Sequence, residues 1–143
     1  MIRRYQSLAF YGGHVYVPTM GKAPSGLLWE VEPVTVLMPE QGALTAVLGT
    51  RLATEPKAVK EWLRGDPPGK NVVQVEAKCR SWISFARRSL RFGLVETGES
   101  WQVSVSEGPT PDDAEECHLP PGSSPEELAG AVLAVAQRRR IWA

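Results

Sequence analysis

Two pairs of neighbouring side chains in this sequence have the types and spacing that catalysis could use. Cys117 and His118 are adjacent, so they offer a thiol nucleophile beside a base. Successive residues of a strand point to opposite faces, however, and the two cannot form a dyad if this segment is a strand. Glu30 and Glu32 lie two apart on an expected strand. They are either an acid–base pair or the solvated face of an amphipathic strand, and we favour the solvated face.

Other chemical signatures are scarce. The chain has two histidines, His14 and His118, whereas a metal site normally recruits several ligands at workable spacing. Neither a dinucleotide-binding nor a P-loop glycine motif is present, and Gly12-Gly13 only indicates a turn. We therefore expect a protein that is not an enzyme and that needs no cofactor or metal.

Charge is balanced over the whole chain but clustered locally. The chain has 16 Lys and Arg residues and 16 Asp and Glu residues, so its net charge gives no reason to expect nucleic-acid or membrane binding. A basic segment contains Lys78, Arg80, Arg87, Arg88 and Arg91. An acidic segment contains Glu107, Asp112, Asp113, Glu115 and Glu116.

The basic segment is interleaved with Trp82, Phe85 and Phe92, a composition that single-stranded nucleic-acid platforms use. The aromatic residues also fall at helical core spacing, which predicts a helix with the aromatic residues on its buried face and the cations on its solvated face. We favour core packing and keep nucleic-acid binding as the alternative. The acidic segment follows two prolines, Pro109 and Pro111, which predict a stiff, projecting loop.

Helices are predicted where apolar residues recur with a helical period. Residues 41–52 predict one helix, with a buried stripe of Leu44, Val47, Leu48 and Leu52. Residues 56–63 predict a second, shorter helix. Residues 80–88 predict a third, capped by Ser81, with Trp82, Ile83, Phe85 and Ala86 inward. The closing helix has Ser124 as its cap, Pro125 in the first position and Glu127 completing a capping box.

Strands are predicted for residues 15–17 and 27–31, on either side of a Pro- and Gly-containing loop, with Pro33 suiting an edge strand. Further strands are expected at 71–75, at 90–96 and 101–106 as a hairpin, and at 115–119. Trp142 either folds back on the sheet or marks a contact surface. The fold class is α+β: one domain, residues 1–143, with a mostly antiparallel sheet packed against several helices and a C-terminal helix closing the core.

The expected location is the cytoplasm. Cys79 and Cys117 are the only cysteines, and without a secretory signal they are expected to be reduced thiols. The first residues are basic, but no apolar stretch of signal-peptide length follows them. No window approaches the ~18 apolar residues of a membrane span.

Several short motifs together resemble one protein family. They are the tyrosine-rich opening Tyr11–Tyr16, Pro18-Thr19, Gly26, Glu32-Pro33-Val34, Ser81-Trp82 with Phe85 and the strand pair after it, and Leu119-Pro120 before the closing helix. In order and spacing, this chain resembles the immunity proteins of bacterial contact-dependent growth inhibition systems, a family once known only as a domain of unknown function. Residues 53–70 and 107–116 depart from the family pattern.

The resemblance implies a protein that binds and neutralises a cognate toxin domain, the C-terminal part of a CdiA-like secreted protein. Family toxins of this kind are often nucleases, whose surfaces are generally cationic because they meet phosphate. An acidic patch would compete for such a surface and steer association. We therefore expect the toxin to contact Glu107, Asp112, Asp113, Glu115 and Glu116, unless this segment is only a solvated turn.

Overall fold

The computed structural model describes residues 2–61, 70–109 and 114–143. Its strands are β1 Arg4–Tyr11, β2 His14–Lys22, β3 Leu28–Leu37, β4 Lys57–Ala58, β5 Leu90–Glu96, β6 Trp101–Glu107 and β7 Glu115–Leu119. Its helices are α1 Gln41–Ala53, α2 Val72–Glu76, α3 Trp82–Arg88 and α4 Pro125–Arg138.

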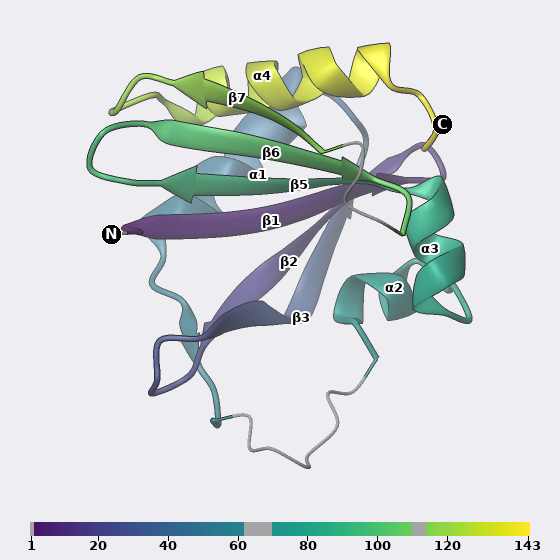
Figure 1. Ribbon diagram of the computed structural model, residues 1–143, viewed down its shortest axis with the longest axis horizontal. Coiled ribbons are helices and arrows are strands. Elements are labelled where there is room, and N and C mark those ends of the chain that lie inside the picture. Colours follow the sequence, from purple (N-terminus) through teal and green to yellow (C-terminus); the bar gives the residue numbers. More distant parts are fainter. Residues whose placement is uncertain (1, 62–69, 110–113) are drawn as a thin grey trace.

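One sheet organises the molecule, with the strand order β3-β2-β1-β5-β6-β7 (Figure 1). Every neighbouring pair in this order is antiparallel, and only the short β4 pairs in parallel, with the end of β2. The predicted α+β class and the mostly antiparallel sheet are confirmed. So is the hairpin of β5 and β6, in which Glu96 pairs with Trp101 across the turn.

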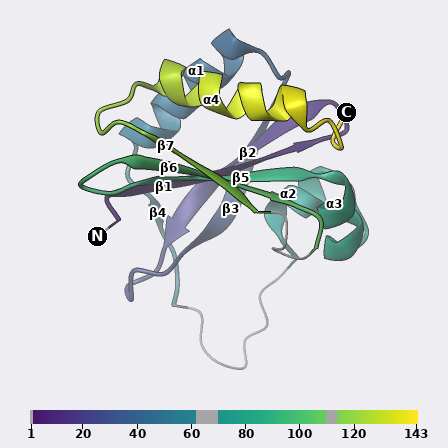
Figure 2. The ribbon, with the colours of Figure 1, turned by 45° about the horizontal axis from the view of Figure 1, so that its top comes forward.

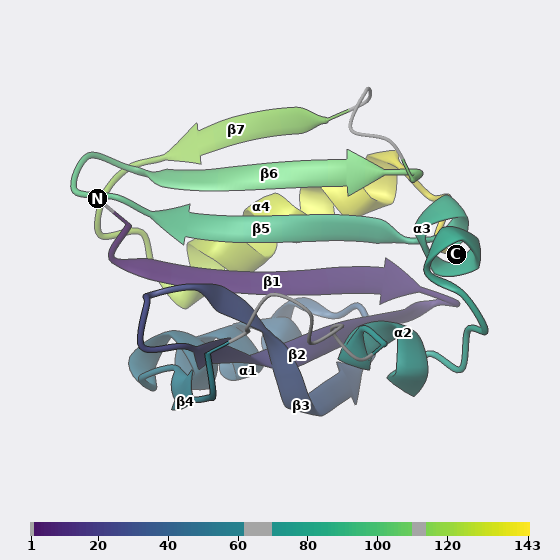
Figure 3. The same cartoon turned by 60° about the horizontal axis from the view of Figure 1, so that its bottom comes forward.

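The sheet buries its two faces very unequally. Helices α1 and α4 cover one face, while α2 and α3 lie on the other (Figure 2). Alternating strand residues such as Leu94, Val103 and Val105 enter the large core beneath α1 and α4. The smaller cluster on the other face contains Ala9, Tyr16, Val73 and Phe85. Because α2 and α3 are short, much of β5 and β6 is uncovered on that face (Figure 3).

Capping and the C-terminal turn fix the helical layer. Ser124 accepts a hydrogen bond from the Glu127 amide, and the Glu127 carboxylate accepts one from the Ser124 amide, so the predicted capping box is present. Beyond α4 the chain folds back, which decides between the two interpretations of Trp142. Its ring is buried against Phe10, with centroids 5.0 Å apart. The Trp142 carbonyl accepts a hydrogen bond from the Gly13 amide at 3.0 Å.

Two predicted elements are wrong. The strand expected at 71–75 is helix α2, because the Asn71 side chain accepts hydrogen bonds from the amides of Val73 and Gln74 and caps a helical turn. The helix expected at 56–63 is contradicted at its start, where Lys57 and Ala58 pair with β2 as strand β4. The end of that prediction, residues 62–63, lies outside the described residues.

Two details of packing also differ from expectation. Strand β2 continues through Pro18 and Gly21, so the connecting loop begins only after Lys22. On α3, Phe85 and Ala86 are buried as predicted, but Trp82 and Ile83 are 42% and 52% exposed. A helix of seven residues has a narrow buried stripe, and Trp82 instead reaches the uncovered part of the sheet.

Candidate functional site

The uncovered sheet face forms a cleft of about 450 Å³ between β3, α2, α3 and the middle of the sheet. Its floor carries hydroxyl groups from β1 and β6, including Ser7, Ser104 and Ser106. Trp29 and Trp82 also line the cleft. Helices α2 and α3 cover only one end of this sheet face, as Figure 3 shows.

Glu30 brings a carboxylate into the cleft. Its Oε2 accepts a hydrogen bond from Ser7 Oγ at 2.5 Å, and its Oε1 accepts one from Asn71 Nδ2 at 2.6 Å. The carboxylate is therefore positioned by two neutral donors, one from β1 and one from the start of α2. Glu32, its proposed partner two residues on, is exposed and does not line the cleft.

Arg91 lies at the α3 end of the same cleft and ties three elements together. Its Nη1 donates to the Ala86 carbonyl at 3.0 Å and to Ser89 Oγ at 2.9 Å, while Nη2 donates to the Gly108 carbonyl. The guanidinium also lies over the Trp82 ring, 5.3 Å from its centroid. Burial lowers the pKa of Arg91, an effect partly opposed by attraction to Glu30. Burial and the charge of Glu30 together raise the pKa of Tyr5, so its phenol stays protonated.

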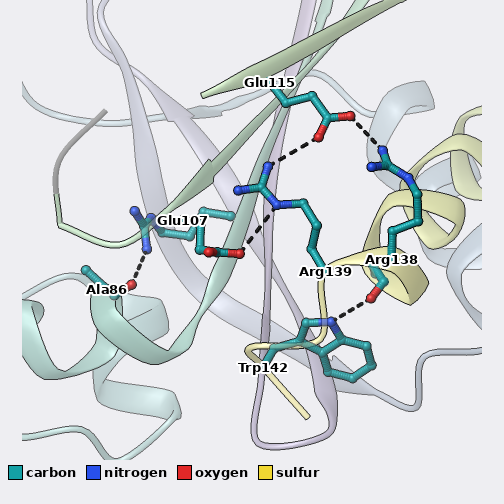
Figure 4. A network of polar contacts seen from close by, with 8 residues as sticks. Ala86, Glu107, Glu115, Arg138, Arg139 and Trp142 are labelled. Carbon is teal, nitrogen blue, oxygen red and sulfur yellow. Dashed lines mark hydrogen bonds and ion pairs between the residues drawn. The ribbon is translucent and has the colours of Figure 1, made fainter. Parts of the chain in front are cut away.

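Part of the predicted acidic segment is engaged within the chain. Glu115 contacts Arg138 at 2.6 Å and Arg139 at 3.3 Å, and Arg139 also approaches Glu107 at 3.4 Å (Figure 4). The hydrogen bond from Arg138 is the main reason that the pKa of Glu115 is lowered. Two of the predicted acids therefore fasten β6 and β7 to the end of α4.

The other predicted acids differ in position. Glu116 is exposed and lies 3.4 Å from His118 Nε2, on the side of β7 opposite to Glu115. Asp112 and Asp113 lie outside the described residues. Toxin contact through this segment stays a prediction.

The remaining sequence candidates can be placed on the fold. Cys117 packs against the large core while His118 is exposed, as the strand alternation predicted. Burial is the main cause of the raised pKa of the Cys117 thiol, which disfavours the thiolate. Cys79 contacts the smaller cluster, on the other side of the sheet. No cluster of three or more potential metal ligands occurs in the described ranges.

The basic segment is split by the fold. Arg91 is tied into the cleft, whereas Lys78, Arg80, Arg87 and Arg88 are exposed and have no ion pair with the residues the structure describes. Phe85 and Phe92 are buried, so of the three aromatics only Trp82 offers an accessible ring. Among the described residues, no helix is long and apolar enough to cross a membrane.

The cleft has no signature in the sequence. From the sequence, Glu30 is a candidate only as part of a pair with Glu32, and nothing there connects it with Ser7 or Asn71. Those residues are 23 and 41 positions away in the sequence, and no local pattern links them.

Comparison with known proteins finds a shared fold but no match in sequence. No family model and no curated protein matches the sequence. A chain of the CdiA-CT/CdiI toxin and immunity complex from Yersinia pseudotuberculosis superposes with a TM-score of 0.60 at 12% identity, covering 96% of this chain and 99% of that one. A protein of unknown function from Neisseria meningitidis gives 0.59 at 11% identity, covering 93% of both chains.

The protein shares its fold with both. The superpositions extend over almost the full length of each chain. At this level of identity the likeness describes the fold alone.

Proposed function

We propose that this chain is a cytoplasmic immunity protein that binds the toxin domain of a contact-dependent growth inhibition system and neutralises it by stoichiometric association. The observation that carries the proposal is the fold shared, over 96% of this chain, with a chain of a CdiA-CT/CdiI toxin and immunity complex. The order and spacing of the sequence motifs support the same role independently of the superposition.

The proposed partner is the C-terminal toxin domain of a CdiA-like secreted protein, and we infer a nuclease activity for it. Binding alone suffices for neutralisation, so the role requires no catalytic group from the immunity protein. It requires a surface held in a fixed shape, because a pre-ordered surface loses little conformational entropy on association. The seven-stranded sheet braced on one face by α1 and α4 is a support of this kind.

The test begins with the gene immediately upstream: if it encodes a CdiA-like protein, the C-terminal domain of that protein is the toxin domain to use. Co-expression of the two chains should allow cells to grow, and a tagged toxin domain should copurify with this protein in equal amounts. An unrelated toxin domain of the same type is the matched control, and it should neither copurify nor be neutralised. Undiminished toxicity in the presence of excess folded protein would reject the proposal.

The same material tests the alternative of nucleic-acid binding through residues 78–91. Under that alternative, the free protein should bind single-stranded oligonucleotides with an affinity that falls steeply with salt. Replacing Lys78, Arg80, Arg87 and Arg88 with Gln should then abolish oligonucleotide binding. Under the immunity role, the free protein has no such affinity.

A further inference from the structure

We propose that the cleft on the uncovered sheet face is a receptor site for an organic cation, a guanidinium or alkylammonium group held between the Glu30 carboxylate and the aromatic side chains around it. The inference concerns a site that the proposed function does not require. The binding experiments that can overturn it need no toxin, so the two proposals can fail separately.

The carboxylate of Glu30 supplies the negative charge of this site. It is half-buried and held by Ser7 Oγ and Asn71 Nδ2, both neutral donors, and it forms no ion pair with any other residue that the structure describes. A carboxylate has about four acceptor positions, and these two hydrogen bonds occupy two of them. A charged donor entering the cleft would find a fixed, partly desolvated acceptor, which is where charge-assisted hydrogen bonds are strong.

Aromatic rings provide the second element of cation recognition. Tyr5, Trp29 and Trp82 all line the cleft, and Trp82 is 42% exposed although it is a large apolar side chain. Ring faces attract cations, and rings gathered around one pocket are the usual receptor for ammonium groups. The cleft already holds one such contact, because the Arg91 guanidinium lies over Trp82.

Arg91 does not take the place of the proposed ligand. Its donors are directed to the carbonyls of Ala86 and Gly108, which anchor its charge at the α3 end of the cleft. No ion pair within the described ranges joins it to Glu30. Its positive charge weakens the attraction for a guest at longer range, so we expect affinity for a small cation in the millimolar range.

The cleft volume of about 450 Å³ lies within the range of small-molecule sites and exceeds the volume of one arginine side chain. The cation could therefore be a free metabolite-sized amine, or a lysine or arginine side chain presented by a bound protein. Both sources offer the same chemistry to Glu30, and the experiment separates them.

The probe is butylguanidinium, and butylurea is its matched control, because the two have nearly the same shape and only the first is charged. Each is titrated into the isotopically labelled protein up to about 100 mM while amide and indole resonances are recorded by NMR, a range that suits millimolar dissociation constants. We expect saturable shifts confined to residues around Glu30, Gly93 and the Trp82 indole with butylguanidinium. Butylurea should cause none of comparable size.

Variants then test the assigned carboxylate. Glu30→Gln keeps the side-chain shape and should weaken butylguanidinium binding at least tenfold. Glu99→Gln removes an equal charge from the exposed β5–β6 turn and should bind like the wild type. Spectra of both variants show whether the fold is retained. Absence of saturable shifts in the wild type, an equal response to butylurea, or unchanged binding by folded Glu30→Gln would each overturn the proposal.

The source of the cation follows from one further titration, with the toxin domain added to the butylguanidinium complex. Displacement of the probe with loss of toxin affinity in Glu30→Gln assigns the site to a side chain of the partner. Continued binding of the probe within the toxin complex assigns it to a free small cation. Either result agrees with the proposed receptor site.

Discussion

Trp142 is the residue through which the end of the chain is joined to the core. Its ring is 4% exposed, it packs edge-on against Phe10, and its indole nitrogen donates to the Ala136 carbonyl at 3.0 Å. A buried tryptophan combines a large apolar area with a satisfied polar group, so its removal leaves both a cavity and an unpaired carbonyl.

We expect Trp142→Ala to lower the free energy of unfolding by about 3–5 kcal/mol, the range for large aromatic deletions from a core. Urea denaturation followed by circular dichroism measures this. Ile141→Ala is the control, because Ile141 is 41% exposed, and it should change stability by less than about 0.5 kcal/mol. Equal, small effects of both substitutions would show that the C-terminal residues do not belong to the core.

The lowered pKa values of two glutamates, Glu96 and Glu115, predict how the stability of the fold depends on pH. Arg4 donates to both oxygens of Glu96, at 2.7 and 3.0 Å, and this pairing lowers the pKa of Glu96, as the pairing with Arg138 lowers the pKa of Glu115. A carboxyl whose pKa is lower in the folded protein contributes stability above its unfolded pKa, about 4.3 for glutamate, and loses it as the pH falls through the folded pKa.

Melting temperatures between pH 7 and pH 3 should therefore decrease most steeply at the acidic end. The double variant Glu96→Gln, Glu115→Gln should have a flatter profile, with a smaller difference from the wild type at pH 3 than at pH 7. Parallel profiles would show that other carboxyl groups control acid unfolding.

Helix α3 separates two aromatic residues that the sequence pattern had placed together. Phe85 is 1% exposed and belongs to the smaller cluster, whereas Trp82 is 42% exposed and borders the cleft. Phe85→Ala should cost about 3–5 kcal/mol, and Trp82→Ala less than about 1.5 kcal/mol, because less of its area is removed from water. Thermal unfolding of the two variants measures the difference. Similar losses for both would mean that Trp82 is as well packed as Phe85.

The predictability of each element depended on how local its determinants are. Helix α4 was predicted with its cap because Ser124, Pro125 and Glu127 are adjacent in the sequence and encode the start directly. Helix α2 was predicted as a strand because Val72, Val73 and Val75 are β-branched, while its helical turn depends on one side-chain cap. Strand β4 was missed because its two residues gain their conformation only by pairing with β2.

Prediction of the cleft from the sequence is limited in the same way, because its determinants are far apart in the chain. Glu30 could be recognised as a candidate from the sequence, but its role depends on Ser7 and Asn71, which the sheet register and the start of α2 bring to it. The acidic segment could also be recognised from the sequence. The pairing of Glu115 with the end of α4 could not, because it depends on the packing of α4 beside β7.

At the scale of the whole molecule, surface charge bears on the proposed recognition of the toxin. The contacts of Glu107 and Glu115 with arginines leave Asp112, Asp113 and Glu116 as the residues to test for toxin recognition. Reversing these three to Lys should slow association with the toxin and remove its salt dependence, while the melting temperature changes little. Association rates measured at several salt concentrations provide the test.

Glu115→Lys serves as the contrasting variant, because loss of its contacts with Arg138 and Arg139 should reduce stability whatever the interface. Unchanged toxin affinity after the triple reversal would reject the acidic segment as the interface. The search would then move to residues 53–70, the other segment outside the family pattern.

The unequal burial of the two sheet faces also implies an order in which parts of the fold unfold locally. Helices α2 and α3 are held by a cluster of four buried residues, whereas the opposite face has a core several times larger. Local unfolding begins where the fewest contacts must break, so α2 and α3 should detach as a unit while the rest of the sheet remains intact. Their amide hydrogens should exchange with solvent deuterium well before those of β1, β5 and β6. Since Asn71 begins α2, each such opening also releases one of the two donors that hold Glu30.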